Sequence, residues 1–133
     1  MLVTDTNVLA RCSRGRAMKR AVALHERGVR LSTTASNGLE LSRKLVDVFE
    51  MNPADAAAET ERVLGLFEVI YPESFEHLRL EAELRLSAAG KSDWPALAAA
   101  MAFDGAIWSD DRDYFGVGVP VWSSGNVLLA AGE

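Results

Sequence analysis

Carboxylic acids stand at four separated places in the chain where one kind of secondary structure gives way to another. Asp5 ends the first apolar run, and Asp93 precedes a helix that starts with a proline. Asp111 and Asp113 follow another short apolar run, and Glu40 lies about one turn into a predicted helix. Oxygen ligands of this kind suit Mg²⁺ or Mn²⁺. If folding brings the four segments together, we expect them to form a divalent metal site.

Convergence of these acids would by itself favour bound cations. Two unit charges about 4 Å apart repel by roughly 4 kcal/mol at an effective dielectric near 20, so the acids must take raised pKa values or bind cations. A carboxylate-held metal can activate water and stabilise the charge on a phosphodiester. A zinc site of the Cys/His type is excluded, because Cys12, His25 and His77 lie outside the four segments. The sequence also has no phosphate loop, dinucleotide fingerprint or serine nucleophile elbow.

Each acid also has a simpler structural explanation. Asp93 is well placed to cap the helix that follows it, and Glu40 is spaced to pair with Lys44 on one helix face. The residues from Asp110 to Asp113 are compatible with a solvated turn. Asp5 is the hardest to explain in this way, because a carboxylate at the end of a core strand is poorly solvated and has no neighbouring cation in the sequence.

Short apolar or β-branched runs alternate with helical patterns along the whole chain. The predicted strands are Leu2–Val3, Val29–Thr33, Phe67–Tyr71, Ala106–Trp108 and an edge strand at Val119–Trp122. The predicted helices are Thr6–Ser13, Arg16–Arg27, a helix from about Ser36 to Phe49, Pro53–Leu66, Glu73–Ala89, a helix from Asp93 to about Asp104, and a last turn at Val127–Ala131.

This alternation predicts an α/β fold, a three-layer α/β/α sandwich of the Rossmann-like kind with a parallel sheet of four to five strands. The length of 133 residues predicts one domain, residues 1–133. In a parallel sheet, the carboxyl ends of the strands and the starts of the following helices lie on the same edge, where ligands usually bind. All four acidic segments are therefore expected at that edge.

Composition places few further limits on function. Apolar residues make up 49% of the chain and charged residues 25%, an ordinary globular mixture, and no apolar run is long enough for a membrane span. We expect no signal peptide, no membrane association, a cytoplasmic location and an unreactive Cys12. The net charge of −5 argues mildly against nucleic-acid binding. Bound cations would reverse the sign locally, and basic residues are concentrated between Arg11 and Arg20.

Four motifs, in order and in register, resemble the PIN-domain family of metal-dependent ribonucleases. Val3-Thr4-Asp5-Thr6-Asn7-Val8-Leu9 resembles the opening of the family, and Leu39-Glu40-Leu41 resembles its helical glutamate. Asp93 before the alanine-rich helix resembles its third acid. Trp108-Ser109-Asp110-Asp111-Arg112-Asp113-Tyr114-Phe115 resembles its hydroxyl-x-Asp-x-Asp-aromatic signature. The resemblance extends from residue 1 to about residue 122, and residues 50–90 match nothing specific.

The resemblance implies a PIN-like nuclease domain that uses Mg²⁺ or Mn²⁺ to cut RNA internally. By this register Asp5, Glu40, Asp93 and Asp111 are the catalytic acids and metal ligands, and Asp113 is a further ligand. Asn7 and Ser109 would orient ligands or water, while Asp110 fills a variable position. Arg11, Arg14 and Arg16 are expected to contact RNA phosphates. Many such domains are toxins held by a small antitoxin, often as homodimers, so both partners are expected here.

Two other functions stay open at this point. A domain with the same fold that binds RNA or protein without cleaving is one, although it would not need all four acids. A magnesium phosphatase with Asp5 as nucleophile is the other, but that chemistry typically needs a second aspartate at position 7, which is Asn7.

Overall fold

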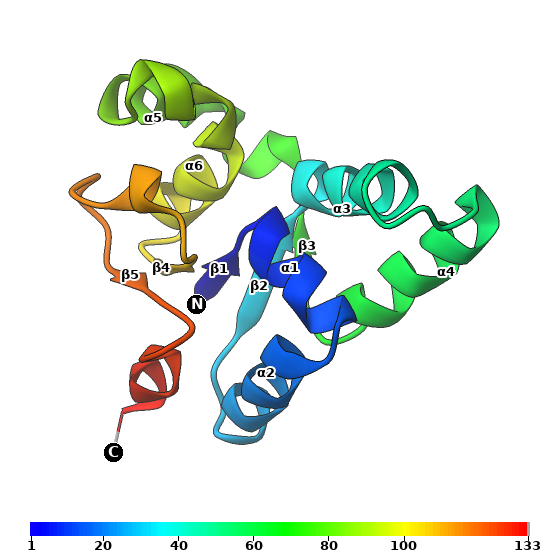
Figure 1. Cartoon of the computed structure of the whole chain (residues 1–133). Helices are drawn as coiled ribbons and strands as arrows, with labels where there is room; N and C mark the ends of the chain where they lie inside the picture. Colours follow the sequence, from blue (N-terminus) through cyan, green and yellow to red (C-terminus); the bar gives the residue numbers. More distant parts are fainter. Residues whose placement is uncertain (133) are drawn as a thin grey trace.

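The computed structural model describes residues 1–132 and contains one five-stranded, fully parallel sheet (Figure 1). The strands are β1 (Leu2–Thr4), β2 (Leu31–Thr34), β3 (Glu68–Ile70), β4 (Ala106–Trp108) and β5 (Val121–Trp122). The α-helices are α1 (Thr6–Ser13), α2 (Arg16–Glu26), α3 (Ala35–Asp47), α4 (Pro53–Leu64), α5 (Arg79–Arg85) and α6 (Trp94–Ala102). Short 3₁₀ helices are η1 (Pro72–Ser74), η2 (Glu76–Leu78), η3 (Ala88–Asp93), η4 (Arg112–Tyr114) and η5 (Val127–Ala131).

The strand order β3-β2-β1-β4-β5 places β1, from the start of the chain, beside β4, from its last third, in the middle of the sheet. From β1 the chain builds outward through β2 to β3, and it then crosses back to place β4 on the other side of β1. Thr4 of β1 lies beside Trp108 of β4, so both strands end at the same level. This reversal of strand order is the position at which open α/β sheets usually bind ligands.

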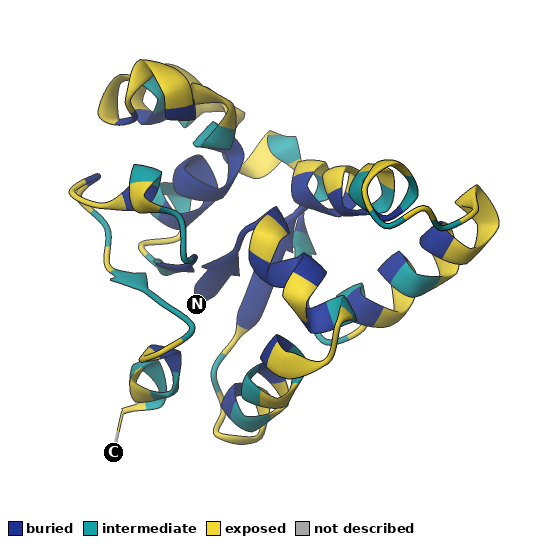
Figure 2. Cartoon of the chain, viewed as in Figure 1, coloured by how far each residue is buried: buried dark blue, intermediate teal, exposed yellow. Residues whose placement is uncertain are grey.

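Helices cover both faces of the sheet, which confirms the predicted three-layer arrangement. Successive strand residues point to opposite faces, and Leu2 accordingly packs into a core with α1, α2, α3 and α4, whereas Val3 packs into a second core with α5 and α6. Figure 2 shows the central strands β1, β2 and β4 and the helix α6 almost entirely buried, while α4 and α5 expose one side to solvent. No helix within residues 1–132 is long and apolar enough to cross a membrane.

The predicted helix from Glu73 to Ala89 is wrong. The segment forms two 3₁₀ turns, the short helix α5, and then an extended residue at Leu86. Phe75 interrupts the helix with φ −143° and is fully buried, its ring 5.8 Å from that of Trp94. The apolar residues in this segment have helical spacing, but burial of Phe75 and Leu86 against α6 outweighs the local preference. The remaining predicted elements are present, with ends shifted by a few residues.

Candidate metal centre

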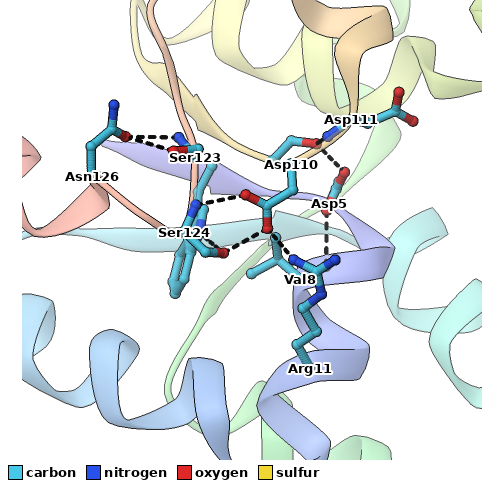
Figure 3. Close-up of polar contacts among 10 residues, drawn as sticks. Asp5, Val8, Arg11, Asp110, Asp111, Ser123, Ser124 and Asn126 are labelled. Carbon is cyan, nitrogen blue, oxygen red and sulfur yellow. Dashed lines mark hydrogen bonds and ion pairs between the residues drawn. The ribbon is translucent and has the colours of Figure 1, made fainter.

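Asp5 is the buried acid at the end of β1, and both of its carboxylate oxygens are engaged. It is the N-cap of α1, where Oδ1 accepts a hydrogen bond of 3.0 Å from the Val8 backbone N–H. Oδ2 accepts a hydrogen bond of 2.5 Å from the Ser109 hydroxyl, which lies directly after β4 (Figure 3). Each oxygen keeps a second lone pair for a further ligand. Ser109 therefore links the ends of the two central strands.

The segment after β4 continues this chain of hydrogen bonds. The Asp111 backbone N–H donates to Ser109 Oγ over 2.9 Å, and the Asp113 backbone N–H donates to Asp111 Oδ1, also over 2.9 Å. Asp111 caps the short helix η4 in this way. The orientation of Asp111 is thus coupled through Ser109 to the buried Asp5 carboxylate.

Asp93, at the end of η3 and directly before α6, lies close to Asp111 and Asp113. One carboxylate oxygen from each of these three residues lies within 4.8 Å of the others. Asp93 stands at the N-cap position of α6, but its side chain makes no capping hydrogen bond. The simpler explanation of Asp93 as a helix cap is therefore not supported, and its carboxylate is left directed to the acidic cluster.

Asp5 and Asp93 both have raised pKa values. Burial raises the pKa of Asp5 to about 6, and the charges of Asp111 and Asp110 add to the rise, while hydrogen bonds from Ser109 and Val8 oppose it. Burial is also the largest cause that raises the pKa of Asp93, to about 6. The smaller causes are the negative charges of Asp111, Asp5, Asp113 and Glu40, in decreasing order. Every acid predicted for the site therefore acts on Asp93. Near neutral pH this concentration of negative charge favours binding of a cation.

Glu40 and Asn7 lie at the exposed margin of this cluster. Glu40 is outside the group of three close carboxylates and is the weakest of the charges that act on Asp93. Lys44 does not pair with Glu40 among the described residues. Its ammonium instead donates a hydrogen bond of 2.7 Å to Asn7 Oδ1. Asn7 makes no contact with Asp5 of the kind expected for a residue that orients it.

Asp110 does not join the acidic cluster, and its contacts were not foreseen from the sequence. Its carboxylate accepts hydrogen bonds of 2.7 Å from both the backbone N–H and the hydroxyl of Ser124, and it forms an ion pair with Arg11 of α1 (Figure 3). The Trp108 indole N–H also donates to Ser124 Oγ, over 3.1 Å. These contacts tie the segment after β4 to α1 and to the segment after β5. The sequence around Asp110 does not indicate these contacts, because Ser124 lies 14 residues further along the chain.

Two further residues shape the cluster without offering a ligand to it. Gly90 is buried so closely against Asp113 that an added Cβ would lie 2.9 Å from the Asp113 carboxylate. The Tyr114 hydroxyl donates a hydrogen bond of 3.2 Å to the Asp93 carbonyl. Burial raises the pKa of this phenol above its ordinary value. The local sequence around Gly90 does not indicate its contact with Asp113.

A separate hydrogen bond joins the starts of α1 and α3. The Asn37 side-chain amide of α3 donates to the Thr6 hydroxyl of α1 over 2.9 Å.

The remaining predicted residues lie on or near α1. Arg11 is occupied by Asp110, the Arg14 guanidinium lies 4.0 Å from the centre of the Phe49 ring, and Arg16 is exposed at the start of α2. Cys12 is buried, and burial raises the pKa of its thiol to about 12, in agreement with the expectation that it is unreactive.

The donor set of Asp93, Asp111 and Asp113 fits a hard divalent cation. Its ligands are carboxylate oxygens alone, and no histidine or cysteine joins the group among residues 1–132. This chemistry suits Mg²⁺ or Mn²⁺ and not a zinc site of the Cys/His type. The arrangement can hold a cation at the edge of the sheet where β1 and β4 end, with the Asp5–Ser109 pair beneath it.

A family model for the PIN domain matches residues 3–131 of the chain. Among solved structures, PAE2754 from Pyrobaculum aerophilum is 16% identical with a TM-score of 0.71, over 98% of this chain and 88% of that protein. FitAcB from Neisseria gonorrhoeae is 20% identical with a TM-score of 0.67, over 93% and 98% of the two chains. FitAB bound to an IR36 DNA fragment is 18% identical with a TM-score of 0.64, over 93% and 95%. At these identities the structures establish a shared fold, and no curated protein matches the sequence.

Proposed function

The chain belongs to the PIN-domain family, and from this premise we propose that it is a metal-dependent endoribonuclease that acts as one domain over residues 1–133. The observation that carries the proposal is the cluster of Asp93, Asp111 and Asp113, whose carboxylate oxygens lie within 4.8 Å of one another beside the buried Asp5. A family of nucleases supplies the reaction class, and the acids supply the site where a cation would act.

In this proposal Asp5, Asp93 and Asp111 are catalytic acids that hold Mg²⁺ or Mn²⁺, with Asp113 as a further ligand and Glu40 at the open margin. A divalent ion in such a site stabilises charge on a phosphodiester and lowers the pKa of bound water. Ser109 keeps the Asp5 carboxylate directed toward the cluster by donating a hydrogen bond to Oδ2. Asp111 is oriented by the same hydroxyl through its backbone N–H. We expect the protein to work in the cytoplasm, where RNA is available.

The test is cleavage of a labelled single-stranded RNA with Mg²⁺ or Mn²⁺ by the wild type, Asp5→Asn and Asp111→Asn. We expect both variants to lose at least a hundredfold in rate while they keep the fold, measured by circular dichroism. Asp47→Asn is the matched control, because Asp47 is exposed near the end of α3 and the substitution changes the charge equally. Cleavage by Asp5→Asn at the wild-type rate would show that the site is misassigned.

A catalytically silent RNA- or protein-binding module is the alternative function. Clean wild-type protein that binds RNA but never cleaves it, with either metal, would favour this alternative. The full set of four acids supports the nuclease instead, because binding alone does not require a cation site.

We also infer that the nuclease is the toxin of a toxin–antitoxin pair, bound by a small antitoxin and able to form a homodimer. Support comes from a groove of about 640 Å³ beside α3 and α4, bordered by the exposed apolar side chains of Leu39 and Tyr71. Exposed apolar surface of this kind is typical of protein interfaces. Growth arrest on expression of the wild type but not of Asp111→Asn would support the toxin role, and light scattering of the purified protein tests the homodimer.

A further inference from the structure

A small pocket of about 210 Å³ lies beside the candidate metal centre, between α1 and the second half of α3. Among residues 1–132, no acidic residue lines it. Its lining residues are Asn7, Ala10, Arg11, Arg14, Lys44 and Phe49. In a chain with a net charge of −5, a pocket whose described lining has three cations and no anion is a local reversal of sign.

Two of these cations have no acidic partner within residues 1–132. Arg11 is neutralised by its ion pair with Asp110. Lys44 donates to a neutral amide oxygen, Asn7 Oδ1, and the Arg14 guanidinium lies over the Phe49 ring. Both contacts hold the charged group in place without cancelling its charge, and Asn7 keeps two amide N–H donors for a further partner. The pocket therefore presents positioned donors for an anion.

The position of the pocket follows from α1, which begins directly after Asp5, and from α3, which carries Glu40. On α3, Lys44 follows Glu40 by four residues, which puts it on the same face one turn, about 5.4 Å, further along. On α1, Asn7 and Ala10 lie on one face that starts directly after Asp5, and Arg14, the C-cap residue, follows them at helical spacing. The pocket thus lies about one helical turn along α3 from Glu40, at the exposed margin of the acidic cluster, so a strand with one phosphate at the cluster could extend its next phosphate toward the pocket.

We propose that this pocket, formed by Asn7, Arg14 and Lys44, binds the backbone phosphate adjacent to the one at the acidic cluster on a single strand of RNA. The inference rests on the proposed nuclease function, because that function places the neighbouring phosphate at Asp93 and Asp111. Arginine and lysine bind phosphate oxygens through charge-assisted hydrogen bonds. The pocket would fix the direction of the strand across the site and contribute to affinity without recognising the bases.

The experiment compares two substrates in steady-state cleavage: an RNA oligonucleotide and a dinucleotide that has only the scissile phosphate. For Arg14→Ala and Lys44→Ala we expect a KM for the oligonucleotide about tenfold higher, a nearly unchanged kcat, and no effect on the dinucleotide. Arg27→Ala is the control, since it removes an equal charge at an exposed position that does not line the pocket. Lys44→Arg keeps the charge and should restore most of the affinity.

A second measurement separates this proposal from the proposed function. Binding of the labelled oligonucleotide to metal-free protein is followed by fluorescence anisotropy over a range of salt concentrations. Arg14→Ala and Lys44→Ala should each weaken binding about tenfold and reduce the salt slope by about 0.7, whether or not the wild type cleaves RNA. Equal losses on the oligonucleotide and the dinucleotide, or losses matched by Arg27→Ala, would overturn the proposed role of the pocket while leaving the nuclease intact. An affinity for RNA that neither variant changes would overturn it as well.

Discussion

The affinity of the acidic cluster for metal is expected to fall steeply between pH 7 and pH 5. Asp5 and Asp93 each have a pKa of about 6, and a metal ion must displace any proton that these carboxylates carry. Each group is about 90% ionised at pH 7 and about 10% ionised at pH 5, a tenfold change. With both groups required, the affinity for Mn²⁺ should fall about a hundredfold, or about 2.7 kcal/mol. Two carboxyls at the usual pKa of 3.8 would change it by less than about 1.2-fold.

The measurement is a calorimetric titration of Mn²⁺ at pH 5, 6 and 7 at constant ionic strength. At pH 6 each carboxyl is half protonated, so binding should release about one proton, which is measured by repeating the titration in buffers with different ionisation enthalpies. Asp5→Asn removes one of the two groups, and any binding that this variant retains should show only about a tenfold change. Asp47→Asn is the control and should follow the wild type. A change below threefold in the wild type would refute the reasoning, because either the two pKa values are ordinary or these residues do not hold the metal.

The other predictions concern residues that support the cluster. The metal-free Asp5→Asn variant should be more stable than the wild type at pH 7.5, by up to about 3 kcal/mol in urea unfolding, because Asp5 has a pKa of about 6 in the fold and 3.8 as its ordinary value. The sign follows from the raised pKa of Asp5. The wild-type stability associated with protonated Asp5 is fully present below about pH 4 and is lost as the pH rises through about 6. The difference in stability between the variant and the wild type should therefore vanish at about pH 4. Gly90→Ala should lower Mn²⁺ affinity about tenfold, because its Cβ would lie 2.9 Å from the Asp113 carboxylate. The loss should be much smaller in an Asp113→Gly background, and an equal loss there would contradict direct contact. Asp110→Ala should cost about 2–3 kcal/mol in urea unfolding, since it leaves the backbone N–H of Ser124 unpaired. Arg11→Ala, which removes only the exposed ion pair with Asp110, should cost less than about 1 kcal/mol, and equal losses for the two variants would argue against this account.

Residues 72–93 illustrate why part of the fold was not predictable from local patterns. Phe75, Leu78, Ala82 and Leu86 have the spacing of one helical face, yet the chain leaves the helix at Phe75 and again at Leu86. Both side chains are buried against α6, and the free energy of burying them is larger than the helix preference of a few exposed residues. The partner that decides the structure of this segment is distant in sequence, so the segment alone carries no signal of it.

The sequence by itself determined the order of strands and helices and the edge of the sheet to which the acids belong. Alternating apolar runs and helical periods are local properties, and short parallel strands joined by helices all end at one edge. Asp5, Asp93 and Asp111 were therefore assigned to a common edge, although they come from positions almost a full chain length apart.

Only the tertiary structure decided which acids approach one another and which do not. Asp93 meets Asp111 and Asp113, whereas Asp110, next to Asp111 in sequence, turns away to Ser124 and Arg11. Neighbouring residues of a loop point in different directions, and the direction that each takes depends on hydrogen-bond partners from other segments. The physical reason is that the strands limit the position of each carboxylate to the edge, while its last few ångströms are set by packing against residues such as Gly90, whose contact with Asp113 exists only in the folded chain.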